Sequence, residues 1–456
     1  MIKIDNDLRP AHLERKIARL WEHSAKKILS IDHGEKPGAA TPVFTVRGKY
    51  TARGWTEWTQ GFVYGSALLQ FDATEERRFL ELGRDRTIGR MAHHITHVGV
   101  HDHGFNNVST YGNLWRLMNE GRVEENQRER DFYELALKCS GAVQADRWTK
   151  TADGRGYIYS FNGPHSLFAD TIRSLRALAL SHKLGHVLMG ERDAKISLLS
   201  RLVEHAEITA QYAVFYGQGR DAYDICGRVA HESIFNVNDG AYRCPNSQQG
   251  YAPFTTWTRG LAWIMLGYAE QLEFLDILPE EDLDALGGHV PLRDMMLRAA
   301  RATCDFYIDH SPADGIPYWD TGAPGLCRMG NYLDRAADPF NDHEPVDSSA
   351  AAIGAQGLLR LGHYLGKEGE KYWQAGLTVL NALFDDPYVS TQDDHQGLLL
   401  HSVYHRPNGW DYIPPGRAVP CGESSMWGDY HARETALYVQ RAISNKPYLT
   451  FFGSEP

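Results

Sequence analysis

Apolar residues recur at helical spacing in one segment after another of this chain, and that repetition restricts the possible folds more than any other feature. In the segment 10–30, for example, Leu13, Ile17 and Leu20 fall on one face of a helix. Strand patterns are few and short, around residues 43–46 and 157–160. The chain is therefore predicted to be all-α. Helices are expected at residues 10–30, 167–183, 194–216, 259–276, 291–308, 348–365, 370–384 and 430–444.

Long connectors rich in Gly, Asp, Pro and Asn separate these helices, and loops of that length are often functional in compact domains. No Ser/Gly-rich linker and no shift in composition divides the chain, so a single domain over residues 1–456 is predicted. Helical hairpins closed into a ring fit this pattern. An open helical solenoid would look similar, although no fixed-period repeat is visible. The connectors cover residues 33–42, 151–165, 236–254, 309–346 and 385–427.

Composition excludes several classes of function. The net charge of −11 argues against nucleic-acid binding, although a few local arginines can still hold an anionic ligand. The six cysteines are scattered without a CxxC pair, which indicates free thiols in a reducing compartment. No signal peptide and no run of about 18 apolar residues is visible, so a cytoplasmic protein without a membrane partner is predicted.

Two aspartates at the edges of helix-like segments are candidate acids. Asp102 lies in His101-Asp102-His103-Gly104-Phe105, and Asp170 lies in Phe168-Ala169-Asp170-Thr171-Ile172. Paired carboxylates are the usual equipment of glycoside chemistry. The alternative is that each is a helix cap or a salt-bridge partner, with Arg173 three residues after Asp170 as its neighbour.

A tryptophan-rich segment, residues 257–263, opens a predicted helix. Arg259 and Trp263 are spaced i,i+4, so a cation and an indole share one helical face. Indoles stack on pyranose faces, and arginine binds carboxylates. The alternative is a buried cation–π pair. Asp347 precedes a run of small residues and is expected to cap a helix.

Five histidines gather in a short stretch, at His93, His94, His97, His101 and His103. Helical spacing would place three of them on one face, which could form a zinc site. The segment has no HExxH pattern and runs into a glycine-containing turn. Packing and hydrogen bonding around a loop is the preferred interpretation, with His101 lining the site and no metal bound.

Ten short motifs, in a fixed order over roughly residues 55–440, resemble glycoside hydrolase family 88, the unsaturated glucuronyl hydrolases. The related unsaturated rhamnogalacturonyl hydrolases are a second possibility. The motifs are Trp58-Thr59-Gln60-Gly61-Phe62, His101-Asp102-His103-Gly104-Phe105, Asp170, His231, Gln249-Gly250, Arg259-Gly260-Leu261-Ala262-Trp263, Pro317-Tyr318-Trp319-Asp320, residues 347–353, Leu400-His401-Ser402-Val403-Tyr404-His405 and Ser425-Met426-Trp427-Gly428-Asp429-Tyr430.

The resemblance implies an (α/α)6 barrel and an unusual hydrolysis. The substrate is an oligosaccharide left by a polysaccharide lyase, with a C4=C5 double bond in its terminal uronyl ring. An aspartate protonates C4, water adds at C5, and the hemiketal opens and expels the aglycone. Asp170 matches the general acid/base and Asp102 the second essential carboxylate.

The resemblance also implies the binding residues and the partners. His231 and Gln249 match residues that position substrate and water, whereas Trp58, Arg259 and Trp263 match the sugar-binding wall. No cofactor is expected, and the chain is expected to be a monomer or homodimer. His103 and Leu261 depart from the family pattern, which bears on the identity of the sugar. A conventional glycosidase or epimerase, and a non-catalytic glycan-binding toroid, remain the alternative hypotheses.

Overall fold

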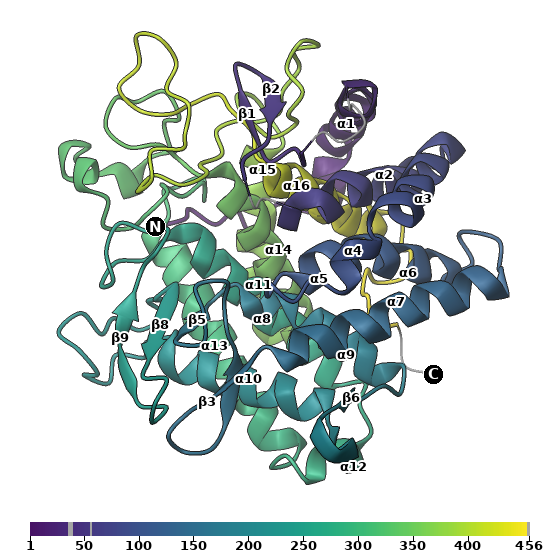
Figure 1. Ribbon diagram of the computed structural model, residues 1–456. Coiled ribbons are helices and arrows are strands. Elements are labelled where there is room, and N and C mark those ends of the chain that lie inside the picture. Colours follow the sequence, from purple (N-terminus) through teal and green to yellow (C-terminus); the bar gives the residue numbers. More distant parts are fainter. Residues whose placement is uncertain (35–39, 55–56, 454–456) are drawn as a thin grey trace.

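Helices arranged in two concentric rings make up most of the molecule (Figure 1). The computed structural model describes residues 1–34, 40–54 and 57–453, so part of the connector predicted at 33–42 lies outside the described residues. The inner ring is formed by α2 (Gln60–Thr74), α5 (His103–Asn107) with the π-helix η3 (Val108–Gly112) and α6 (Asn113–Asn119), α8 (Thr171–Ser174) with α9 (Arg176–Lys183), α11 (Thr258–Leu275), α14 (Ser348–Leu365) and α16 (Met426–Ile443).

The outer ring covers the inner one. Each outer helix packs against the inner helices beside it. The outer helices are α1 (Glu14–Gly34), α3 (Arg77–Arg90), α7 (Gln127–Asp146), α10 (Leu198–Tyr212), α13 (His289–His310) and α15 (Glu370–Leu383). Shorter helical pieces are η1 (Pro10–Leu13), η2 (Glu57–Thr59), α4 (Ala92–Ile95), η4 (Glu191–Asp193), α12 (Glu280–Asp284), η5 (Pro324–Arg328), η6 (Tyr332–Asp334) and η7 (Gly366–Gly369).

The ring is closed. The last inner helix, α16, packs against both α14 and the first inner helix, α2. This contact confirms the predicted ring of helical hairpins and excludes the open solenoid, because the two ends of a solenoid do not meet. The single apolar core runs continuously from Ile2 to Phe452. In the part of the chain that the structure describes, no helix is long and apolar enough to cross a membrane.

Small antiparallel strand pairs and one three-stranded sheet lie in the connections between the helices. The predicted strands at 43–46 and 157–160 correspond to β1 and β4, each shifted by a residue or two. The strands are β1 (Phe44–Val46) with β2 (Lys49–Thr51), β3 (Trp148–Lys150) with β4 (Gly156–Ile158), β6 (Leu188–Met189) with β7 (Lys195–Ile196), and the three-stranded sheet β5 (Ser166–Phe168), β8 (Glu232–Phe235) and β9 (Tyr242–Asn246).

One predicted helix begins in the wrong place. Residues 166–168 form β5, which pairs with β8, and the helix follows as α8 and α9. All three residues of β5 are buried. A short, fully buried strand has no polar side to reveal its period, so it cannot be told from helix by pattern.

Glycines let the inner helices touch backbone to backbone. A Cβ atom on Gly104 of α5 would lie 2.2 Å from the Ser174 carbonyl oxygen of α8, and one on Gly61 of α2 would lie 2.3 Å from the Asn106 carbonyl oxygen of α5. No side chain fits at such distances. Three consecutive inner helices are thereby held in direct contact, and the residues at their N-terminal ends are brought together.

Candidate active site

A pocket lies where the inner helices begin. Trp58 precedes α2, Asp102 precedes α5 and Asp170 precedes α8, and all three line the same cavity. The cavity has a volume of roughly 640 Å³, including the part that is open to solvent. Aromatic lining residues include Trp58, Phe105, Trp257, Trp263, Tyr404 and Trp410. Polar lining residues include His101, Asp102, Asp170, Gln249, Arg259 and His405.

Both aspartates occupy N-cap positions without capping their helices. Neither Asp102 nor Asp170 accepts a cap hydrogen bond from its own helix within the described chain. The carboxylates turn into the pocket instead, although only 6% of Asp102 and 9% of Asp170 is exposed. Arg173, the neighbour that a salt-bridge interpretation of Asp170 required, pairs with Glu270 and Glu434. The interpretation of Asp170 as a cap or as a partner of Arg173 is therefore wrong.

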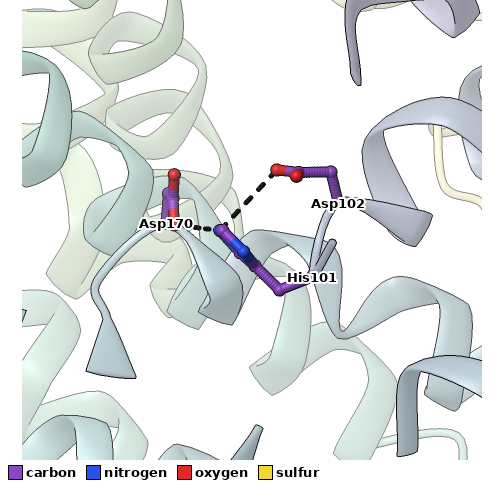
Figure 2. Close-up of side chains that lie close together, drawn as sticks. All are labelled: His101, Asp102 and Asp170. Atoms are coloured by element: carbon purple, nitrogen blue, oxygen red, sulfur yellow. Dashed lines mark hydrogen bonds and ion pairs between the residues drawn. The ribbon is translucent and has the colours of Figure 1, made fainter. Parts of the chain in front are cut away.

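The imidazole of His101 lies between the two carboxylates (Figure 2). Its Nε2 atom is 3.2 Å from Asp170 Oδ1 and 3.7 Å from Asp102 Oδ1. The backbone of His101 is held firmly, because Ser174 Oγ and Gln144 Nε2 both donate hydrogen bonds to its carbonyl oxygen. The three titratable groups therefore form one coupled unit, fixed at the contact between α5 and α8.

The pKa values of the two aspartates in this unit are shifted in opposite directions. Burial raises the pKa of Asp102 to about 6, with the negative charge of Asp170 adding to the effect and His101 opposing it. Burial also pushes the pKa of Asp170 upward, but the charge and hydrogen bond of His101 outweigh it and hold that pKa below its usual value. The pKa of His101 is raised despite burial, because two carboxylates face it.

The resemblance makes Asp170 the general acid, a role for which a raised pKa is expected, and the lowered pKa contradicts that expectation. The physical reason is the imidazole: Asp170 makes the short ion pair with His101, so its charged form is stabilised. Asp102 is farther from the imidazole and carries the raised pKa instead. Both shifts favour the proton on His101, 3.2 Å from Asp170, over the proton on Asp170 itself.

His231 and Gln249 lie together, as their matching motifs imply. Gln249 lines the pocket, and its amide Nε2 is 3.4 Å from His231 Nε2. His231 lies behind it, packed against Phe168 and Trp257 with ring centroids 4.7 and 4.6 Å away. Burial lowers the pKa of His231 to about 4, so this imidazole is neutral and orients Gln249.

Arg259 and Trp263 both line the pocket, but the contacts of the described residues do not include the cation–π pair between them that was the alternative interpretation. The Arg259 guanidinium lies over the rings of Trp257 and Trp427, at 4.4 and 4.8 Å from their centroids. Its Nη1 atom donates to Asp347 Oδ2 at 2.6 Å, and further N–H groups donate to the backbone carbonyls of Val403 and Tyr404 in the 385–427 connector. Arg259 thus braces the pocket wall, although it still reaches the cavity.

Asp347 has two tasks in this brace. Its Oδ1 atom accepts hydrogen bonds from the first turn of α14, which confirms the predicted N-cap. Its Oδ2 atom pairs with Arg259 of α11. One carboxylate therefore ties the beginnings of two neighbouring inner helices together.

The histidine cluster is used for hydrogen bonding. His94 Nε2 lies 2.7 Å from Gln60 Oε1, and its Nδ1 atom lies 3.1 Å from Asn106 Nδ2. Both ring nitrogens of His103 are likewise engaged, by Ser140 Oγ and by the carbonyl of His97. A nitrogen engaged in this way is not free to coordinate zinc. Burial lowers the pKa of His94 to about 3 and of His103 to about 4.

One group of potential metal ligands coincides with the pocket itself. Ligand atoms of His101, Asp102 and Asp170 all lie within 4.8 Å of one another. The same spacing also allows these groups to share protons. The ion pair between His101 and Asp170 already neutralises part of the carboxylate charge that a metal cation would otherwise compensate. The absence of a catalytic metal remains a prediction.

Several pocket residues escaped the sequence interpretation. Tyr404, His405 and Trp410 come from the 385–427 connector, and Gln248 and Phe161 come from two others. Loop residues have no periodicity, so only the fold shows that they converge. His405 did belong to a quoted motif, and Gln248 adjoins the expected Gln249.

Comparison with known proteins places this geometry in context. No family model matches the chain. The unsaturated glucuronyl hydrolase of Bacillus sp. (strain GL1) is 24% identical over 412 residues, covering 88% of this chain and 90% of that protein. The unsaturated chondroitin disaccharide hydrolase of Streptococcus agalactiae serotype III (strain NEM316) is 20% identical over 390 residues, covering 84% and 81%.

Solved structures show the same fold. A heparin-specific unsaturated glucuronyl hydrolase superposes with a TM-score of 0.72 and 19% identity, covering 95% of this chain and 98% of that one. A variant named UGL, bound to dGlcA-Glc-Rha-Glc, gives a TM-score of 0.69 and 20% identity over the same shares. The closed double ring is thus the (α/α)6 barrel of these enzymes. Over more than four-fifths of its length the chain is thus similar in sequence to unsaturated glucuronyl hydrolases, and it shares their fold, in agreement with the resemblance to glycoside hydrolase family 88.

Proposed function

We propose that this chain is a glycoside hydrolase that removes an unsaturated (4,5-ene) uronyl residue from the non-reducing end of lyase-generated oligosaccharides. The observation that carries the proposal is the unit of Asp102, His101 and Asp170 in an aromatic-walled pocket. Relatives of similar length are named unsaturated glucuronyl hydrolases. The motifs that carry the family resemblance contain these same three residues.

Asp170 is the proposed proton donor, and His101 is its immediate source of protons. The proton crosses the 3.2 Å hydrogen bond from His101 to Asp170 as the substrate enters and excludes water. Asp170 then protonates C4 of the vinyl ether, and positive charge develops at C5 beside the ring oxygen. The regenerated carboxylate accepts a proton from the water whose oxygen attacks C5, so Asp170 is restored.

The later steps require no further acid of unusual strength. The C5 hemiketal opens to a ketone as the bond between C5 and the ring oxygen breaks, and the hemiacetal at C1 then releases the aglycone. The proposed role of Asp102 is electrostatic. Its negative charge stabilises the cation that forms at C5, and its raised pKa makes that charge sensitive to pH near 6.

The proposed binding wall consists of Trp58, Trp263, Gln249 and Arg259, with His231 behind Gln249. Trp58 is stacked on Trp427 at 5.2 Å, which fixes its ring for contact with a sugar face. α11, which is 18 residues long, begins at the pocket, so its positive dipole end favours an anionic uronyl group despite the net charge of −11.

A conventional retaining glycosidase is the second candidate. Its two carboxyl groups typically lie about 5–5.5 Å apart. Oxygens of Asp102 and Asp170 lie within 4.8 Å of each other, which is close to that spacing. Such an enzyme would release sugar from saturated substrates, whereas the proposed one requires the double bond.

The decisive experiment is a screen of unsaturated disaccharides from several lyases, followed by ultraviolet absorbance. Loss of the absorbance of the double bond, with no release of sugar from saturated analogues, is the expected result. Release from saturated substrates would support the conventional glycosidase, and binding without turnover would support a glycan-binding protein. The proposal further includes a cytoplasmic location, a monomer or homodimer, and no cofactor.

A further inference from the structure

Besides His101, whose Nδ1 atom has no partner among the described residues, two residues of the pocket wall carry such an atom. Within the described residues, the Oε1 atom of Gln248 and the Nε2 atom of His405 are buried and make no hydrogen bond. Both residues line the pocket of the two aspartates, and neither is among the residues assigned above. Buried polar groups are nearly always satisfied, so these two atoms are candidates for contact with a ligand.

The backbone of Gln248 is strained. Its φ is +53°, in the left-handed region that favours glycine. The backbone N–H of Gln249 donates to the Ser247 carbonyl oxygen at 2.5 Å, closing a three-residue turn with Gln248 at its centre. A turn of this kind with positive φ is rare. Glycine would fit here without strain, so the presence of a long amide side chain points to a use for that side chain.

His405 has one defined tautomer. Its Nδ1 atom accepts a hydrogen bond from the backbone N–H of Asn408 at 3.3 Å. The proton of the neutral ring therefore sits on Nε2, the buried atom without a partner. Trp410 packs against the ring, with centroids 4.8 Å apart, and fixes its direction. Burial and the nearby Arg259 lower the pKa of His405 to about 4, so the ring stays neutral at physiological pH.

We infer that Gln248 and His405 are substrate-binding residues that recognise the unsaturated uronyl ring through its oxygens. This inference rests on the proposed function. Gln248 Oε1 accepts a hydrogen bond from a ring hydroxyl, because an acceptor cannot hold a carboxylate. His405 Nε2–H donates to another oxygen of the same sugar. Recognition by neutral groups suits this pocket, because three of the five N–H groups of Arg259 already bind protein acceptors.

The chemistry of the ring makes the inference testable. A uronyl ring with a C4=C5 double bond retains hydroxyls only at C2 and C3, so two deoxy substrates cover every possibility. Wild-type enzyme should lose about 3- to 10-fold in kcat/KM on one of them, the range expected for one neutral hydrogen bond. Gln248→Met should show a similar loss of kcat/KM on the full substrate, mostly through a higher KM. On the deoxy substrate that wild-type enzyme uses less well, the variant should show no further loss.

Two more variants separate binding from structure. Gln248→Gly removes the side chain and the strain together, so Tm should be unchanged or higher while KM rises. His405→Phe keeps the ring against Trp410 but lacks the donor, and should raise KM at every pH between 6 and 8. His405→Gln places a donor near the same point and should restore part of the affinity. Gln374→Met, a buried glutamine on the outer helix α15 whose Oε1 also lacks a partner within the described chain, is the matched control.

The outcomes distinguish this inference from the proposed function. If wild-type enzyme consumes no unsaturated disaccharide, the proposed function fails before any variant is compared. Suppose that wild-type enzyme is active, but that Gln248→Met lowers kcat/KM on each deoxy substrate by the same factor as on the full substrate. Gln248 then does not touch a ring hydroxyl. A KM unchanged in His405→Phe would remove His405 from the site.

Discussion

The helix α8 carries buried charges of two different kinds, one turn apart. Asp170, at its beginning, is compensated only by an imidazole. Arg173, three residues later, is fully buried and lies 2.7 Å from both Glu270 and Glu434, with Arg176 beside the same glutamates. Both places hold anions away from water, yet their chemistry differs.

The difference lies in the counter-ion. An arginine stays protonated at any physiological pH, so the pKa of Glu434 is held far below its usual value and its charge is permanent. A histidine can release its proton near neutral pH. The cluster of Arg173, Arg176, Glu270 and Glu434 therefore serves structure, whereas the unit of His101, Asp102 and Asp170 can move a proton.

The largest expected effect concerns Asp170. Asp170→Asn retains shape but cannot donate a proton to C4, so kcat should fall by about 10²–10⁴-fold while substrate still binds. The measurement is turnover of an unsaturated disaccharide, with folding checked by circular dichroism. A folded variant with near wild-type turnover would refute the assignment.

Glu434→Gln should act on stability instead. Removing one partner of a buried ion pair leaves a buried guanidinium without full compensation, which costs about 3–5 kcal/mol of unfolding free energy. Chemical denaturation measures this loss. The matched control is Glu368→Gln, because Glu368 pairs with Arg301 at the surface and should change stability by about 0.5 kcal/mol or less. Equal losses for the two variants would contradict the distinction.

Asp102→Asn should change how stability depends on pH. A pKa raised from 3.8 to about 6 means that the folded protein binds this proton more tightly than the unfolded chain. The resulting stabilisation is complete below pH 3.8 and is lost as pH rises through about 6, a difference of up to about 3 kcal/mol. The variant should therefore be more stable than wild type at pH 8 and nearly equal at pH 4. It should also lose activity severely.

His101→Gln should have a smaller effect on turnover than Asp170→Asn, about 10-fold, because Asp170 can still be protonated from water. The more informative readout is the pH profile. Without the imidazole, the pKa of Asp170 should rise, because the charge and the hydrogen bond that lower it most are removed while burial remains. Because Asp170 must be protonated to act as the acid, the alkaline limb of the activity profile should then follow its carboxyl and no longer the imidazole, and an unshifted limb would show that His101 does not control Asp170.

Chelation should have no effect. Protonation of a vinyl ether needs a Brønsted acid and a positioned water, so dialysis against a strong chelator should leave turnover unchanged. If activity disappears and zinc restores it, the group of His101, Asp102 and Asp170 is a metal site, and the proton unit must be rejected.

The sequence predicted the long helices that have a pronounced apolar face. The segment 348–365 matches α14 residue for residue, because Asp347 caps it and small residues run through it. The helices α2, α3, α5 and α7 were missed, although Asn126 caps α7. Nearly every residue of α2 is buried, so it has no polar face, and α5 continues into a π-helical turn that breaks the period.

The candidate site, like the helices, was predicted from the sequence only in part. Motif order alone singled out Asp102, Asp170, Gln249 and Arg259, and the structure places all four in one pocket. The two aspartates are 68 positions apart in the sequence, and this separation carries no information on their distance in space. That distance is decided where Gly104 meets Ser174, because only a missing side chain allows α5 and α8 to touch.

What the sequence by itself determined is the all-α class and the choice of Asp102 and Asp170 as candidate acids, since these depend on residue type and order. What only the tertiary structure decided is the state of those acids and the rest of the wall. A pKa depends on burial and on the nearest charge, and Gln248, His405 and Trp410 come from loops without periodicity. Such loops converge only when the barrel closes and the N-terminal ends of its inner helices meet.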